Sequence, residues 1–93
     1  MLNSNKVNIK SVFKNVVGNT IINIQEKQGI IICSHAGGPN YSAFFVNYDN
    51  IYRLASIGEM FSVSKGDDTE YVAKSGTNYH TIWVLSKGDI KIG

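Results

Sequence analysis

The feature that most constrains this chain is the regular spacing of turn-forming residues along it. Glycine or Asp/Asn turn signals occur at Gly18, Gly29, Gly37-Gly38-Pro39-Asn40, Asp49-Asn50, Gly58, Gly66, Gly76 and Gly88. They recur about every 8 to 12 residues, the interval typical of strands joined by tight turns in a β-sandwich or β-barrel. Such spacing leaves little room for helices, so the sequence predicts an all-β protein.

The segments between these turns have the composition of strands. They are short and rich in β-branched and aromatic residues, which suit a pleated and half-buried surface. The nine segments are Lys6–Lys14, Asn19–Glu26, Gly29–Ser34, Tyr41–Tyr48, Ile51–Ala55, Met60–Ser64, Thr69–Lys74, His80–Ser86 and Asp89–Ile92. We therefore predict an antiparallel, jelly-roll-like β-sandwich of about eight to nine short strands. A chain of 93 residues is too short for a second core, so residues 1–93 are predicted to form one domain.

One segment also admits a helical interpretation. Ile51, Leu54, Ala55, Gly58 and Phe61 fall near helical spacing. Gly58 and the β-branched content weaken a helix there. A strand is the favoured prediction for residues 51–55.

Alternation of apolar and polar residues predicts which faces are buried. In the first segment Val7, Ile9 and Phe13 share one side against polar neighbours, so we expect them to face the core. The pairs Phe61 and Val63, Phe44 and Val46, Trp83 and Leu85, and Ile90 and Ile92 are expected at the core or an interface in the same way. Two runs, 30–32 and 82–85, are apolar on both faces. Such strands are either covered on both sides or meet a partner chain with their outer face.

Composition and charge exclude several classes of partner. The formal net charge is +2, and the basic residues are scattered singly, which is not typical of a nucleic-acid surface. No stretch approaches the roughly 18 apolar residues of a membrane span, and residues 1–6 lack the apolar core of a signal peptide. Neither nucleic-acid binding nor membrane insertion is predicted.

The sequence contains no recognisable catalytic or cofactor-binding motif. Cys33 is the single cysteine, so no intramolecular disulfide is possible, and its place in an apolar run predicts a buried thiol. Cys33 and His35 would share one face of a strand, but two ligands are a weak metal signal. Asp67, Asp68 and Glu70 are expected to form a solvated turn. We predict a protein that is not an enzyme, with no catalytic residue, cofactor or metal.

The candidate ligand-binding residues lie in two loops that contain tyrosine. Asn40 and Tyr41 close the loop from residue 37, and Asn78, Tyr79 and His80 close the loop from residue 76. A flat apolar ring beside hydrogen-bonding neighbours suits a sugar ring or a protein partner. The alternative is that these tyrosines only anchor the loop ends to the sandwich.

The order of segments resembles a family of viral modules. The matching segments are Asn19-Thr-Ile-Ile-Asn-Ile, Gly29-Ile-Ile-Ile-Cys-Ser-His, Ala43-Phe-Phe-Val-Asn-Tyr, Ile51-Tyr-Arg-Leu-Ala, Met60-Phe-Ser-Val-Ser-Lys and Thr81-Ile-Trp-Val-Leu. They look like the small β-sandwich head modules of tail-fibre and baseplate receptor-binding proteins of bacteriophages and prophages. The resemblance covers about Asn19–Gly93. It implies a virion-associated homotrimer that adheres to a surface glycan or protein.

A different function follows if the chain is free-standing. It begins with its own methionine and has no shaft-like segment, unlike a module at the end of a fibre. A small protein from a similar genetic setting could instead inhibit a host defence enzyme by protein–protein binding in the host cytoplasm. A third reading, a small barrel that binds single-stranded nucleic acid, lacks the basic groove it needs.

Overall fold

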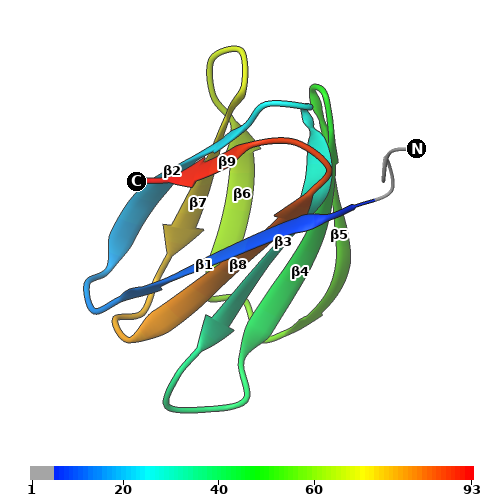
Figure 1. The fold of residues 1–93 in the computed structure, drawn as a ribbon. Helices are drawn as coiled ribbons and strands as arrows, with labels where there is room; N and C mark the ends of the chain where they lie inside the picture. The colour runs from blue at the N-terminus through cyan, green and yellow to red at the C-terminus, as the bar shows by residue number, and fades with distance from the viewer. Residues whose placement is uncertain (1–5) are drawn as a thin grey trace.

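In the computed structural model, which describes residues 6–93, the chain forms strands connected by short turns (Figure 1). The strands are β1 (Asn8–Lys14), β2 (Gly18–Ile24), β3 (Gln28–His35), β4 (Tyr41–Asn47), β5 (Asn50–Ile57), β6 (Phe61–Lys65), β7 (Glu70–Ser75), β8 (His80–Ser86) and β9 (Ile90–Ile92). All nine predicted segments are strands, with ends that differ by at most two residues. The helical interpretation of residues 51–61 is wrong, because β5 extends through Ile57.

The strands form two antiparallel sheets that pack face to face. One sheet has the order β1-β8-β3-β4-β5 and the other β6-β7-β2-β9. The neighbours β8-β3-β4-β5 have the spatial order of a Greek key, in which a late strand returns to lie beside an earlier hairpin. The prediction of an all-β antiparallel sandwich is confirmed.

The core lies between the two sheets and is built mainly from isoleucine and valine. Each such side chain contributes roughly 1.5–3 kcal/mol when it is fully buried. The buried cluster consists of Ile22, Ile24, Ile31, Cys33, Val46, Phe61, Tyr71, Ala73, Ile82, Val84 and Ile90. The predicted burial of Phe44, Val46, Phe61, Ile90 and Cys33 is confirmed.

The prediction for the first strand is wrong. Register places Val12 of β1 opposite Ile82 of β8, so Val12 faces the core with the even-numbered residues. Ile9 and Phe13 therefore lie on the outer face, where they are 63% and 56% exposed. The alternation of apolar residues predicted that the more apolar face of β1 is buried. The pairing of β1 with β8 determines instead which face of β1 is turned toward the core.

Two strands are apolar on both faces, as predicted. Ile31 of β3 and Val84 of β8 point into the core, while Ile32 and Trp83 point outward. The second sheet covers only the inner face, so in residues 6–93 no layer of this chain lies over the outer one. Glycine is required at position 29, the second residue of β3, because a Cβ there would collide with the backbone carbonyl of Leu85.

The two long sides of the sandwich are closed differently. On one side the Arg53 guanidinium of β5 donates to Ser42 Oγ at 2.8 Å and to the carbonyl of Phe61, in β6, at 3.2 Å. On the other side, Asn8 of β1 donates to the carbonyl of Gly88 and Lys14 donates to that of Gly93.

In the described part of the chain, no helix is long and apolar enough to cross a membrane. The signal-peptide prediction concerns residues 1–6, of which 1–5 lie outside the described part.

Candidate functional site

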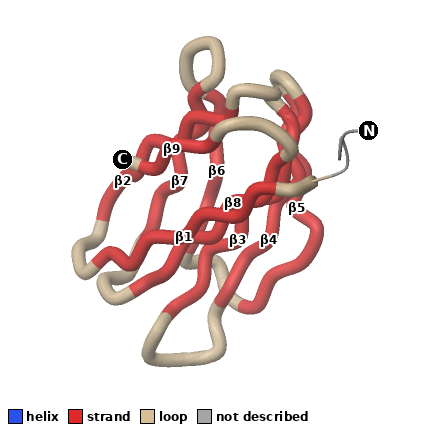
Figure 2. Tube along the Cα trace, in the orientation of Figure 1, coloured by secondary structure: helices blue, strands red, loops and turns tan. Residues whose placement is uncertain are grey.

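Four connections gather at one end of the sandwich, which we call the loop end: residues 15–17, 36–40, 58–60 and 76–79. Backbone hydrogen bonds tie three of them together. Ala36 N–H donates to the carbonyl of Tyr79 at 2.7 Å, and Gly76 N–H donates to that of Met60 at 2.7 Å. Figure 2 shows these connections on the lower side of the view, opposite the other four. The two loops that the sequence singled out are therefore neighbours.

Tyr79 is an exposed aromatic side chain of the loop end, where Val16 and Val17 are also exposed. It is 54% exposed, and its φ of 57° lies in the left-handed region. A bulky residue there costs about 1–3 kcal/mol, and Lys27, Tyr48 and Asp68 in the connections at the other end have the same conformation, so the strain alone does not mark a site. The Tyr79 ring stacks on Phe13, with 6.4 Å between centroids and 25° between planes. Together the two rings form an exposed aromatic surface.

The other predicted site residues take different positions. Asn78 is exposed beside Tyr79, whereas Asn40 and Tyr41 are half-buried. Asn40 packs against Gly58, where a Cβ would lie only 2.9 Å from its Nδ2 atom. Gly58 also has a φ of 76°, so this close approach requires glycine. Asn40 is thus held in place by the neighbouring connection.

His80 lies inside the sandwich, where only 2% of its surface is exposed. Its Nδ1 atom is 3.0 Å from the carbonyl oxygen of Thr77, and because a carbonyl only accepts, Nδ1 carries the proton. Burial lowers the His80 pKa below its ordinary value, the Thr77 bond opposes this shift, and the charge of Lys14 adds to it. The neutral ring fixes the 76–79 loop from beneath, so a ligand would meet Asn78 and Tyr79 first.

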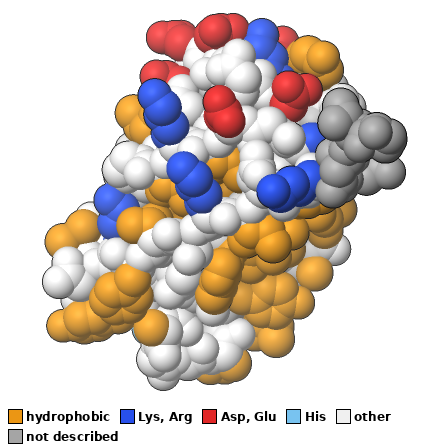
Figure 3. All heavy atoms as spheres, in the orientation of Figure 1, with side chains coloured by type: hydrophobic (Ala, Val, Ile, Leu, Met, Phe, Trp, Pro, Cys, Tyr) orange, Lys and Arg blue, Asp and Glu red, His pale blue; other side chains and the backbone are white. Residues whose placement is uncertain are grey.

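Charge is divided unequally between the two ends. The loop end has one charged residue in its connections, Glu59. The opposite connections, residues 25–27, 48–49, 66–69 and 87–89, contain Glu26, Lys27, Asp49, Asp67, Asp68, Lys87 and Asp89. Figure 3 shows this separation, with red and blue side chains at the top and orange side chains below. The loop end is therefore poor in charge, with Glu59 in its connections and Lys14 at the adjoining end of β1.

Groups that could carry chemistry are sparse in the described residues. Among residues 6–93, no three His, Cys, Asp or Glu side chains lie close enough together to hold a metal ion. The Cys33 thiol is buried, and desolvation raises its pKa to about 12. A thiol with that pKa stays protonated at neutral pH and is a poor nucleophile or ligand.

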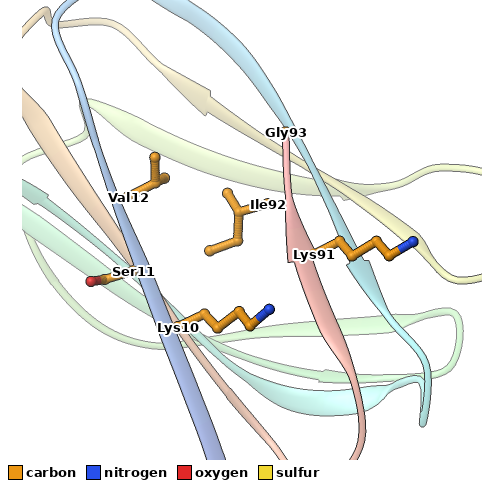
Figure 4. A pocket seen from close by; sticks show the side chains of 6 residues that line it. All are labelled: Lys10, Ser11, Val12, Lys91, Ile92 and Gly93. Atoms are coloured by element: carbon orange, nitrogen blue, oxygen red, sulfur yellow. The ribbon is translucent and has the colours of Figure 1, made fainter.

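A gap of about 530 Å³ lies between β1 and β9, lined by Lys10, Ser11, Val12, Lys91, Ile92 and Gly93. In Figure 4, Lys10 and Ile92 point into this gap from opposite strands, while Lys91 points away from β1. The backbones of β1 and β9 are not paired, and side-chain bonds from Asn8 and Lys14 of β1 reach the carbonyls of Gly88 and Gly93, which flank β9. We interpret the gap as the open seam of the sandwich.

Comparison with known proteins gives one weak likeness. No family model and no curated protein matches the chain. The tailspike protein of Acinetobacter phage vB_ApiP_P1 is similar in structure, with a TM-score of 0.45 and 15% sequence identity. The match covers 100% of this chain but 24% of the tailspike chain, so this protein spans about a quarter of that length. The chain therefore has a weak, distant resemblance to a phage tail protein.

Phe13 is the residue of this end that sequence reasoning missed. The alternation of the first segment assigned it to the core, although it lies on the outer face beside Tyr79. Its nearness to Tyr79 depends on the pairing of β1 with β8, which places Phe13 opposite Thr81. The chain separates Phe13 and Tyr79 widely, so no local pattern could have joined them.

Proposed function

We propose that this protein is a non-enzymatic binding module of the phage receptor-binding type, whose loop end adheres to an uncharged surface ligand. The observation that carries the proposal is the Phe13–Tyr79 stack, exposed in a cluster of connections with almost no charge. Aromatic faces beside amides and hydroxyls suit sugar rings, and Asn78 and Thr77 supply such groups in the same loop. We therefore favour a neutral surface glycan over a protein.

Adhesion by such a module gains from multiple copies. A homotrimer would present three loop ends, and linked weak sites add through effective concentration. Moderate affinity at each loop end is then sufficient. A homotrimer is accordingly part of this proposal.

The structure offers a matched pair of tyrosines for the experiment. Tyr79 and Tyr48 are 54% and 55% exposed, and both have φ values in the left-handed region. Tyr48 lies at the opposite, charged end, in the β4–β5 connection. Truncation of either side chain to alanine therefore removes a similar exposed ring and leaves similar backbone strain, because alanine keeps the Cβ.

Binding is measured on a glycan array and on intact bacterial cells. We expect Tyr79→Ala to weaken binding by about tenfold, which corresponds to about 1.4 kcal/mol, and Tyr48→Ala to leave it unchanged. We also expect little change with added salt, because the loop end makes few charged contacts. Equal loss in both variants, or none in Tyr79→Ala, would remove the loop end as the site. A monomer that binds no glycan would favour the inhibitor of a host enzyme instead.

A further inference from the structure

We infer that copies of this chain associate through the outer face of the β1-β8-β3-β4-β5 sheet. This builds on the homo-oligomer in the proposed function. The face shares Phe13 and Tyr41 with the loop end, so its test uses Ile9, which lies toward the opposite end of β1 from Phe13. We call this surface the apolar face. Its strand residues are Ile9, Ser11, Phe13, Thr81, Trp83, Leu85, Gln28, Ile30, Ile32, Ser34, Tyr41, Ala43, Phe45, Asn47, Asn50, Tyr52, Ala55 and Ile57, with the amides of Gln28, Asn47 and Asn50 together at one end.

The apolar face carries no charge. None of the residues that these five strands contribute to it, from Ile9 on β1 to Ile57 on β5, is Asp, Glu, Lys or Arg. Arg53, on β5, pairs with Phe44 and turns toward the inner side, where it contacts Ser42. A single-sign charge would repel its own copy across a symmetric interface. An uncharged face avoids that cost, so the faces of three copies can pack around a common axis in the proposed homotrimer.

The other sheet of the same molecule provides the comparison. Its outer face presents Asn19, Asn23, Ser62, Ser64, Glu70, Lys74 and Lys91, with Ile21 and Val72 among them. That is the ordinary pattern of an antiparallel sheet with one face in water. The apolar face lacks this polar pattern, although it belongs to the same chain. An apolar composition of the whole chain therefore does not explain the difference between the two outer faces.

The area of the apolar face matches what a stable interface needs. Ile9 is 63% exposed, Tyr52 51%, Ile57 50% and Trp83 36%. Leu54, at the bulge in β5, is 58% exposed beside them. Roughly 100 Å² is accessible on each of these side chains and on Phe13, and the half-buried Ile30, Ile32, Phe45 and Leu85 add to a total on the order of 800 Å². A standard interface buries about 800 Å² on each partner.

The edges of this sheet are less suited to pairing between copies. The register of β5 shifts between Ala43 and Phe44, and this bulge interrupts the edge. The other edge, β1, faces β9 across the seam and is tied to it by Asn8 and Lys14. Continuous pairing of strands across two copies is therefore impeded, and the face is left as the surface for association.

The test compares two exposed isoleucines on opposite sheets. Ile9→Lys places a charge on the apolar face, and Ile21→Lys places one on the polar sheet, where Ile21 is 45% exposed. Both side chains lie largely in solvent in a single copy, so neither change should unfold it; far-UV circular dichroism checks this. We expect wild type and Ile21→Lys to sediment as oligomers at micromolar concentration, and Ile9→Lys to associate at least about tenfold more weakly.

Trp83 supplies a second readout, because it is the one tryptophan and lies on the apolar face. Dilution of the wild type should shift its emission to longer wavelength as the face becomes hydrated. A monomeric wild type, or equal weakening by Ile9→Lys and Ile21→Lys, would overturn the inference. Tyr79→Ala separates the two proposals, since it should lower ligand binding while the sedimenting mass stays unchanged. Ligand binding by a monomer would contradict the apolar-face inference and the homotrimer, and would leave the loop end as the ligand site.

Discussion

Arg53 joins the two sheets along their β5–β6 side, and its removal gives a prediction with a defined size. The guanidinium donates to Ser42 Oγ at 2.8 Å and to the Phe61 carbonyl at 3.2 Å, and it lies 4.9 Å from the centre of the Phe44 ring. Ser42 is fully buried, and this is the hydrogen bond its hydroxyl makes. Arg53→Met keeps the aliphatic stem but leaves that hydroxyl without its donor.

The expected destabilisation by Arg53→Met follows from the contacts that the guanidinium loses. Hydrogen bonds to a charged group contribute about 1.5–3 kcal/mol, and an exposed cation–π contact about 0.5–1 kcal/mol. Because Arg53 is partly hydrated, we take the lower values and expect Arg53→Met to lower the free energy of unfolding by about 2 kcal/mol. For a domain of this size that corresponds to a melting temperature lower by roughly 8–16 °C.

A double-mutant cycle tests the reasoning more strictly than either change alone. Ser42→Ala should cost about 1 kcal/mol or less, because water can solvate the released guanidinium. In Arg53→Met/Ser42→Ala the orphaned hydroxyl is absent, so the double variant should be no less stable than Arg53→Met. Urea unfolding of the four proteins then gives a coupling of about 1 kcal/mol. Additive losses would refute the proposed contact between the sheets.

Three further predictions concern buried polar groups. Cys33, with its pKa raised to about 12 by burial, should react with a disulfide reagent at pH 8 only after denaturant is added; rapid reaction of the folded protein would contradict its position. Burial lowers the His80 pKa, so the unfolded state binds the proton more tightly. The unfolding midpoint should therefore fall as pH drops below about 6.5, and less steeply in His80→Gln; equal slopes would exclude His80 as the cause. Tyr71→Phe should cost about 1–2 kcal/mol in urea unfolding, because the buried hydroxyl donates to the Tyr48 carbonyl at 2.8 Å; an unchanged midpoint would refute that bond.

The strands were predictable because their signals are local. Glycine and Asp/Asn turns interrupt β-branched segments at short intervals, and His80–Ser86 was predicted with the bounds that the structure shows. The near-helical spacing of apolar residues in 51–61 does not correspond to a helix, and Gly58, with its positive φ, lies in the turn that follows β5. Local chemistry alone therefore determined most of the element boundaries.

The buried side of each strand and the order of strands in a sheet were harder to predict from the sequence, because they depend on pairing between distant segments. β8 lies between β1 and β3, and only this placement turns Ile9 and Phe13 outward and Val12 inward. The apolar character of the first strand is real, but it belongs to an exposed face. The sequence pattern indicates that one face of a strand is apolar, but it does not indicate which other part of the protein covers that face.

The candidate site was predictable in its loops and not in its details. The tyrosine-bearing loops at 37–41 and 76–80 are neighbours, as the hypothesis of a shared ligand surface requires. The burial of His80 and the stacking of Phe13 on Tyr79 arise from strand register. The separation of charge between the two ends also depends on the fold, because successive connections lie at opposite ends of the sandwich.

In the proposed function the loop end, rather than the charged end, contacts the ligand. The most direct measurement is a titration of isotope-labelled protein with the best-binding glycan from the array, followed by amide chemical shifts. We predict that the shifts that move belong to residues 36–41 and 76–80, around Tyr79. Movement confined to residues 25–27, 48–49, 66–69 and 87–89 would contradict the account.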